Sequence, residues 1–258
     1  MFSRKRKRER LRSKPFPPEW ITILERNVAV YRRLPAADQT ELQGHVQVFL
    51  NEKHFEGAGG LELTDEIRVT IAAQACLLLL HRETDYYPEL TSIVVYPTGY
   101  TAQEERYIGG GLWEEGPEDR LGHTAHNLRA LVLAWDAARH GAMDPTDGSN
   151  VVLHEFAHQL DFENQSSDGT PVLDTHAEYL SWARVMSREF QRLREGDSYV
   201  LDYYGAKNPT EFFAVATEAF FERPRALRIR HPDLYRALQK FFRQDPVTFS
   251  SETINADE

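Results

Sequence analysis

The stretch that decides the fold is residues 150–161, Asn-Val-Val-Leu-His-Glu-Phe-Ala-His-Gln-Leu-Asp. It contains a His-Glu-x-x-His pattern in an apolar run whose composition predicts an α-helix. On a helix, His154 and His158 lie about 40° apart around the axis and about 6 Å apart along it, so both imidazoles face one side. Two such imidazoles can chelate one zinc ion. Glu155 then lies beside the metal, where a general base takes a proton from a zinc-bound water during peptide hydrolysis.

The residues around this pattern favour a buried helix, because most of them are apolar: Val151, Val152, Leu153, Phe156, Ala157 and Leu160. The alternative is that two surface histidines and a solvated glutamate share the spacing by chance. A helix with so much apolar surface should not hold three polar side chains unless they have partners. We therefore expect a zinc centre with one Zn²⁺ per chain.

Composition limits the classes of protein that remain. The chain has 258 residues, of which 41% are hydrophobic, enough for a packed core. It has no apolar run of 18 residues and no secretory signal pattern, so we expect a cytoplasmic protein with no membrane partner. Cys76 is the single cysteine, which excludes an intrachain disulfide and a cysteine-based zinc site. A net charge of −10 argues against nucleic-acid binding over the main domain.

The charge and hydrophobic patterns predict three regions. Residues 1–14 are strongly basic and are expected to form a disordered arm. Residues 15–245 are expected to form a single domain, and residues 246–258 a frayed tail. Within the domain, periodicity predicts helices near residues 20–31, 38–49, 65–80, 176–193 and 234–242, with Thr64 as the N-cap of the third. Strands are expected at 92–96 and 128–135, with a glycine-rich mobile loop at 109–122 between them.

A catalytic zinc ion needs a third protein ligand, and we choose Glu211. It opens a predicted helix in which Asn208 suits the N-cap and Pro209 the first helical position. Asn208 and Glu211 also fit a capping box, in which the Glu211 side chain bonds back to the Asn208 amide instead of binding metal. From the residues alone, the ligand and the cap remain equally good interpretations of Glu211.

Other side chains compete for the same position. Glu218 lies two helical turns after Glu211 on the same face, and it could bind the metal or support a ligand. Asp161 follows His158 by three residues, a place where a carboxylate more often supports a ligand or caps the helix. His123 and His126 could add or replace a ligand, although exposed loop histidines are ordinary.

The body of the chain, from about residue 15 to residue 242, resembles the Mlc titration factor A family of zinc-dependent peptidases. The resemblance rests on residues 55–65, 71–76, 94–97, 150–161 and 208–214. The catalytic segments are also similar to those of anthrax lethal factor, which pairs His-Glu-Phe-x-His with a later Tyr-x6-Glu. In this chain that second pattern matches Tyr204 and Glu211.

This resemblance implies an α+β zincin fold of the gluzincin type, rich in helices, with a small β-sheet over the active-site helix. It implies that Glu211 is the third zinc ligand, after His154 and His158. It also implies that the hydroxyl of Tyr204 stabilises the oxyanion or protonates the leaving amine, with a packed aromatic as the alternative. The expected activity is a zinc-dependent, aminopeptidase-like hydrolysis of small peptides. Some family members also bind the transcriptional repressor Mlc, so a regulatory protein that sequesters a transcription factor is the alternative function.

Overall fold

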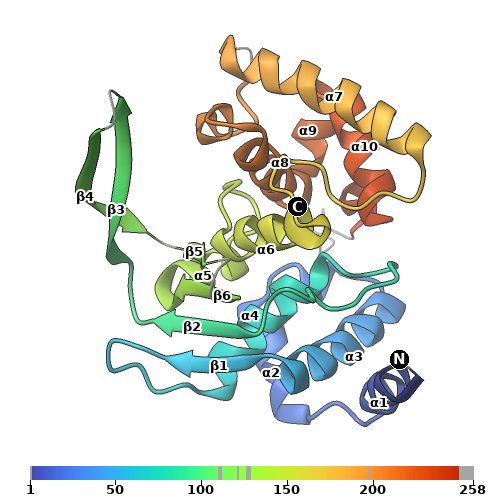
Figure 1. The fold of residues 1–258 in the computed structure, drawn as a ribbon. Helices are drawn as coiled ribbons and strands as arrows, with labels where there is room; N and C mark the ends of the chain where they lie inside the picture. The colour runs from blue at the N-terminus through green and yellow to red at the C-terminus, as the bar shows by residue number, and fades with distance from the viewer. Residues whose placement is uncertain (1, 110–111, 121, 126–128, 197, 250–258) are drawn as a thin grey trace, which may run out of the picture.

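The computed structural model describes residues 2–109, 112–120, 122–125, 129–196 and 198–249. It is rich in helices and contains a four-stranded sheet and a two-stranded hairpin, as expected for an α+β protein (Figure 1). The first part of the chain forms α1 (Phe2–Arg12), α2 (Pro18–Asn27), the short 3₁₀ helix η1 (Tyr31–Arg33), α3 (Ala36–Glu52) and α4 (Asp65–Leu77). The predicted helices in this part are confirmed, with boundaries that differ by a few residues.

Helix α4 is buried on nearly all sides, because small and aliphatic side chains occupy its whole circumference. The Thr64 side chain accepts a hydrogen bond from the backbone N–H of Ile67 and caps the helix, as predicted. Helices α2 and α3 pack against α4 on one side, and the metal-site helix α6 (Val151–Asp161) packs against it on the other. This buried helix therefore connects the N-terminal helices to the site.

The sheet has the strand order β1-β2-β6-β5. Strands β1 (His54–Gly57), β2 (Ser92–Tyr96) and β6 (Ala130–Ala134) run parallel, and β5 (Gly122–Ala125) runs antiparallel to β6 at the edge. The two strands predicted from the sequence, β2 and β6, are confirmed, but both lie inside the sheet. The edge strand beside α6 is the four-residue β5, which is too short to give a clear alternating pattern.

The predicted loop at residues 109–122 is wrong for most of its length. Residues of β3 (Tyr100–Gly109) pair with those of β4 (Leu112–Arg120) in an antiparallel hairpin. Of the glycines that suggested a loop, Gly109 ends β3, and residues 110–111 lie outside the described part of the chain. The charged residues that followed them belong to a two-stranded ribbon, whose strands need no apolar alternation.

The second part of the chain is helical and includes α6 and α8, which pack against each other (Figure 1). Its elements are α5 (Trp135–Met143), α6, η3 (Phe162–Asn164), α7 (His176–Arg194), η4 (Tyr203–Ala206), α8 (Pro209–Glu222), α9 (Pro224–Arg230), α10 (Pro232–Phe242) and η5 (Pro246–Thr248). Phe156 of α6 packs against Phe49 and Tyr87, and this contact anchors the helix in the core. Phe213 of α8 packs against Trp182 of α7. Aromatic contacts thus fix α6 and α8 from opposite sides.

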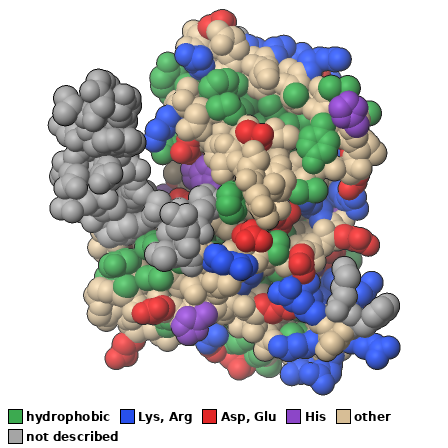
Figure 2. Space-filling model, in the orientation of Figure 1, with side chains coloured by type: hydrophobic (Ala, Val, Ile, Leu, Met, Phe, Trp, Pro, Cys, Tyr) green, Lys and Arg blue, Asp and Glu red, His purple; other side chains and the backbone are tan. Residues whose placement is uncertain are grey.

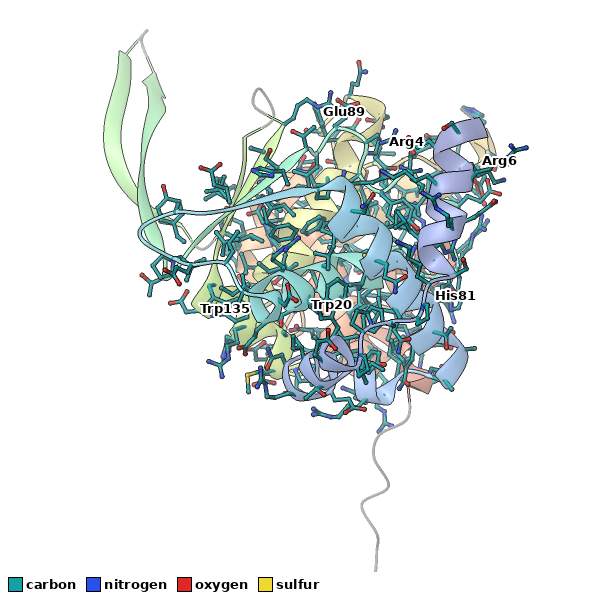
Figure 3. The ribbon with its side chains drawn as sticks, turned by 90° about the horizontal axis from the view of Figure 1, so that it is seen from below. Arg4, Arg6, Trp20, His81, Glu89 and Trp135 are labelled. Atoms are coloured by element: carbon teal, nitrogen blue, oxygen red, sulfur yellow. The ribbon has the colours of Figure 1, made fainter. Side chains whose placement is uncertain are left out.

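The N-terminal arm is ordered, so the prediction of a disordered segment at residues 1–14 is wrong for residues 2–12. Helix α1 packs on α3 and buries Leu11. Arg8 donates two hydrogen bonds of 2.8 Å to the carboxylate of Glu52 and a third to Asp85. Lys and Arg side chains crowd the surface around the N-terminus, at the lower right of Figure 2. Arg4 faces the body while Arg6 lies on the opposite side of the helix (Figure 3).

Replacing Arg8 with Ala should release α1 from the body. The paired hydrogen bonds of a partly buried Arg to a carboxylate are worth about 1–2 kcal/mol, and this loss should raise the population of detached α1 about tenfold. Limited trypsin digestion, read by mass spectrometry, should show faster cleavage within residues 4–12. Arg6→Ala is the matched control, because Arg6 is exposed and its replacement also removes one cleavage site. Equal rates for both variants would contradict this anchoring of α1.

The prediction of a frayed tail is wrong for residues 246–249. Residues 246–248 form η5, and Phe249 is buried in the core. Residues 250–258 lie outside the described part of the chain. Pro246 and Phe249 are apolar residues, and this segment packs on the body next to α9 because it buries them there.

Candidate metal centre

Helix α6 presents His154 and His158 on one side, as the spacing predicted. The Asn150 side chain caps the helix by accepting a hydrogen bond of 3.0 Å from the backbone N–H of Leu153. The two imidazole rings lie 4.8 Å apart between their centroids. Glu155 lies next to them in sequence and is only 6% exposed. The trio therefore lies on a helix that is otherwise held in the core.

Helix α8 brings Glu211 to these histidines. Asn208 caps α8 by accepting a hydrogen bond of 2.9 Å from the backbone N–H of Glu211, and Pro209 occupies the first turn, as predicted. Glu211 does not return the bond to Asn208. Its Oε2 lies 3.0 Å from Nε2 of His154 and 3.3 Å from Nε2 of His158. Glu211 therefore takes part in the cap through its backbone N–H, while its side chain lies at the two histidines.

The donor atoms of His154, His158 and Glu211 lie within 4.8 Å of one another and can hold a single metal ion. Ligands around a tetrahedral ion with bonds of ~2.0–2.1 Å stand roughly 3.3 Å apart. The observed separations of 3.0 and 3.3 Å between the carboxylate and the two imidazoles match this value. Two imidazole nitrogens and one carboxylate oxygen are also a ligand set that suits zinc.

Glu218, the competing ligand in the sequence, lies behind His154 and outside this cluster. Its Oε1 is 2.7 Å from Nδ1 of His154, and its Oε2 accepts a hydrogen bond from the backbone N–H of Asn150. A carboxylate on Nδ1 fixes the imidazole so that Nε2 faces Glu211. The side chain of Glu218 thus connects α8 both to the start of α6 and to one of its histidines.

The carboxylates around His154 control its protonation. Burial lowers the pKa of His154, but hydrogen bonds with Glu211 and Glu218 outweigh burial and raise that pKa to about 10. Burial raises the pKa of Glu211, and the two imidazoles outweigh that effect and hold it far below the usual range. The site therefore concentrates negative charge at the position that a cation would take.

Asp161, the other acidic candidate, also lies outside the cluster. It is fully buried and accepts a hydrogen bond of 3.0 Å from the backbone N–H of Gly169. Gly169 has a positive φ of +75°, and a side chain there would collide with the backbone of Pro209. Asp161 therefore holds the loop after α6 against the first turn of α8.

Tyr204 comes close to the cluster from η4, just before α8. Its hydroxyl lies 3.4 Å from Oε1 of Glu211, and its ring centroid is 5.9 Å from that of His154. The side chain is 49% exposed, so its hydroxyl can reach a molecule at the site. A packed core aromatic, the alternative for Tyr204, does not fit this exposure.

The remaining candidate ligands from the sequence are His123 and His126. His123 lies on β5, and its backbone is paired with Val132 of β6. His126 lies outside the described residues. Within the described part of the chain, the cluster at the metal position consists of His154, His158 and Glu211.

Glu222 is a buried acid near the site that the sequence did not single out, although it follows Glu218 by four residues on an apolar helix. It is 6% exposed, and neither carboxylate oxygen has a hydrogen-bond partner among the described residues. With Gln74 and Asn150 it lines a small cavity beneath the start of α6, about 20 Å³ in volume. Burial, with the nearby Glu218 and Asp147, raises the pKa of Glu222 to about 9.

Glu222→Gln should stabilise the metal-free protein more at pH 8 than at pH 5. The unfolded chain loses the Glu222 proton near pH 4.5 while the folded chain keeps it to about pH 9, so stability falls as pH rises between these values. Gln removes this loss, and its advantage should grow by on the order of 4 kcal/mol from pH 5 to pH 8. Urea unfolding with a chelator present measures it, with the exposed Glu62→Gln as control. A gain that is the same at both pH values would contradict a neutral, buried Glu222.

Comparisons with known proteins place the chain in a family. Residues 2–243 match the family model of the glucose-regulated metallo-peptidase M90. An uncharacterized protein of Synechocystis sp. is 37% identical over 243 residues, which cover 93% of this chain and 88% of that protein. Mlc titration factor A of Pectobacterium atrosepticum is 31% identical over 208 residues, or 77% of this chain and 76% of that protein. Mlc titration factor A of Serratia proteamaculans is 28% identical over 226 residues, covering 83% of this chain and 84% of that protein.

The family match spans nearly the whole described chain and includes α6 and α8, which carry the cluster, and η4, which carries Tyr204. Among the described residues, no helix is long and apolar enough to cross a membrane. The resemblance to the Mlc titration factor A family, which the short sequence motifs indicated, is confirmed. The chain belongs to the M90 family of glucose-regulated metallo-peptidases.

Proposed function

We propose that this protein is a zinc-dependent peptidase with a gluzincin-type zincin fold that acts in the cytoplasm. The observation that carries the proposal is the convergence of His154 and His158 of α6 with Glu211 of α8. Glu155 lies beside the two histidines on α6. In this proposal His154, His158 and Glu211 hold one Zn²⁺ per chain. Zinc at that position supplies a Lewis acid that lowers the pKa of a water molecule and polarises the peptide carbonyl.

The other residues of the site handle protons and charge. Glu155 takes a proton from the attacking water and passes it to the leaving amine. Tyr204 donates its hydroxyl hydrogen to the negative charge that develops on the carbonyl oxygen. Glu218 acts through His154 by holding its ring in place, and it touches no reacting atom.

Substrate binding is supported by the position of β5. This strand contacts α6, and among the described strands its single partner is β6. Its other edge offers backbone N–H and C=O groups to an extended peptide, which would add as a further strand. Such binding presents a peptide bond to the helix that carries His154 and His158.

Hydrolysis of a mixed peptide library by the zinc-loaded protein tests this function, with the chelated protein as control. Sequencing the products by mass spectrometry separates removal of N-terminal residues, the aminopeptidase-like action that we propose, from internal cleavage. Products should appear with the zinc-loaded protein only. Absence of products from every peptide, with one zinc bound per chain, would contradict peptidase activity.

A second candidate function is binding of a transcriptional repressor of the Mlc type. It is supported by the name Mlc titration factor A, which the relatives from Pectobacterium and Serratia carry. The alternative noted from sequence, a regulatory protein without catalysis, would rest on this binding alone. Capture of purified repressor by the wild type and by Glu155→Gln should succeed equally if binding does not need turnover. Failure of both to capture it would remove this function.

A further inference from the structure

A second cavity lies apart from the metal cluster, between η3, α7 and α10. Its volume is about 330 Å³, within the range of ~300–1,000 Å³ found for small-molecule sites. The residues that matter for its chemistry are Arg82, Glu163, Val172, Leu173, Trp182 and Phe241. None of the metal-cluster residues lines it. Helices α7 and α10, which pack against each other at the upper right of Figure 1, both contribute residues to its lining.

Arg82 contributes an unpaired cation to this cavity. Its Nη1 is buried and has no hydrogen-bond partner among the described residues. The guanidinium carbon lies 4.1 Å from the ring centroid of Phe241, so the ring covers one face of the group. A buried charged donor without a partner is costly, and a carboxylate is the partner that its planar geometry fits best.

Glu163 contributes an unpaired anion to the same cavity. Within the described chain its carboxylate forms no hydrogen bond and no ion pair, although Arg82 acts on it electrostatically. Both side chains are half-buried, and this burial raises the pKa of Glu163 and lowers that of Arg82. The two residues line one space without forming an ion pair with each other.

The other charges of the cavity satisfy one another. Lys240 pairs with Glu178 at 2.9 Å, and Arg243 pairs with Asp174 at 3.1 Å. Glu83 lies at the exposed rim. Charge pairing inside the cavity is therefore incomplete for Arg82 and Glu163, which lie 81 positions apart in the sequence but face the same volume.

The remaining wall is apolar. The rings of Trp182 and Phe241 pack edge to face with centroids 5.5 Å apart, and Leu173 is packed against the core beside them. The indole N–H of Trp182 is already used in a 3.0 Å bond to the carbonyl of Gly169. Val172, at the mouth, is 47% exposed. A ligand would therefore meet a hydrophobic surface next to the two opposite charges.

We propose that this cavity binds a small zwitterion with an apolar side chain, either a free α-amino acid or a dipeptide. Its carboxylate pairs with Arg82, its ammonium group with Glu163, and its side chain rests on Trp182, Phe241 and Leu173. A simple anion would leave Glu163 unpaired and repelled, and a simple cation would do the same to Arg82. The proposal does not depend on the peptidase function.

Isothermal titration calorimetry with the full-length, chelated protein tests this binding, and the absence of metal separates it from binding at the histidine cluster. The probes are the amino acids L-leucine and L-phenylalanine and the dipeptide L-leucyl-L-leucine. Whichever class binds with the higher affinity identifies the ligand as an amino acid or a dipeptide. N-acetyl-L-leucine lacks the ammonium group and L-leucinamide lacks the carboxylate. Each analogue should bind at least about tenfold more weakly than L-leucine. No saturable binding of any probe, or equal affinity for the analogues, would overturn the proposal.

Variants test whether Arg82 binds the carboxylate of the ligand and Glu163 its ammonium group. Arg82→Met should weaken L-leucine binding about tenfold or more, whereas Arg236→Met, which removes an exposed arginine elsewhere on α10, should leave it unchanged. Glu163→Gln should weaken L-leucine but not N-acetyl-L-leucine, a selective effect that misfolding cannot produce. Val172→Trp should block the mouth without changing any charge. If Arg82→Met and Val172→Trp both bind L-leucine like the wild type, the ligand lies elsewhere and the proposal is wrong.

Discussion

Glu155→Gln is expected to lower kcat for peptide hydrolysis about 10³-fold while the protein keeps its full zinc content. Gln has nearly the shape of Glu but cannot accept a proton from water, and general-base catalysis is worth about 10²–10⁴-fold in rate. Glu155 is not one of the three clustered donors, so metal binding should not change. Peptide turnover and zinc content by mass spectrometry, measured on the same samples, check both parts.

The control for this variant is Glu25→Gln, the same substitution at an exposed position on α2. It should keep the wild-type rate. Retained turnover in Glu155→Gln would exclude Glu155 as the base. Loss of zinc together with activity would instead assign Glu155 to metal binding.

Glu211→Ala is expected to weaken zinc binding by more than ~10²-fold, because it removes one of three protein ligands. Glu218→Gln should weaken it by about 10–100-fold, the usual effect of losing a group that orients a ligand. The fold should survive the Glu211 change, since Asn208 caps α8 through the backbone N–H of residue 211 and not through its side chain. Competition against a fluorescent zinc chelator measures each affinity.

The order of the two variants decides which carboxylate binds metal. A larger loss in Glu218→Gln than in Glu211→Ala would make Glu218 the third ligand. Unchanged affinity in both would direct attention to Asp161, which the structure places against Gly169.

The parts of the site predicted from sequence are those set by local rules. The spacing of His154 and His158 and the cap of Asn208 on α8 depend on neighbours within four residues, and the structure has both. The choice between Glu211 and Glu218 was not decided by the residues, because both lie on one face of α8. It depends on how α8 crosses α6, and in the structure that crossing directs Glu211 to Nε2 and Glu218 to Nδ1 of His154.

One prediction that failed, the disordered arm, and one pair that the sequence did not reveal, Arg82 and Glu163, depend on contacts distant in sequence. The basic run of α1 looked like a disordered arm because its partners, Glu52 and Asp85, follow Arg8 by 44 and 77 positions. The edge strand β5 is too short to recognise without its partner β6. Arg82 and Glu163 are ordinary surface charges in a sequence and become a cavity pair only after α7 and α10 close around them.

Titration of the metal-free protein with Zn²⁺ during continuous peptide hydrolysis tests the central claim most directly. If His154, His158 and Glu211 hold the catalytic metal, the rate should rise in proportion to added zinc and level off at one equivalent per chain. A protein that binds one equivalent and remains inactive, or a rate that does not depend on zinc, would contradict the assignment of this cluster as the centre of a peptidase.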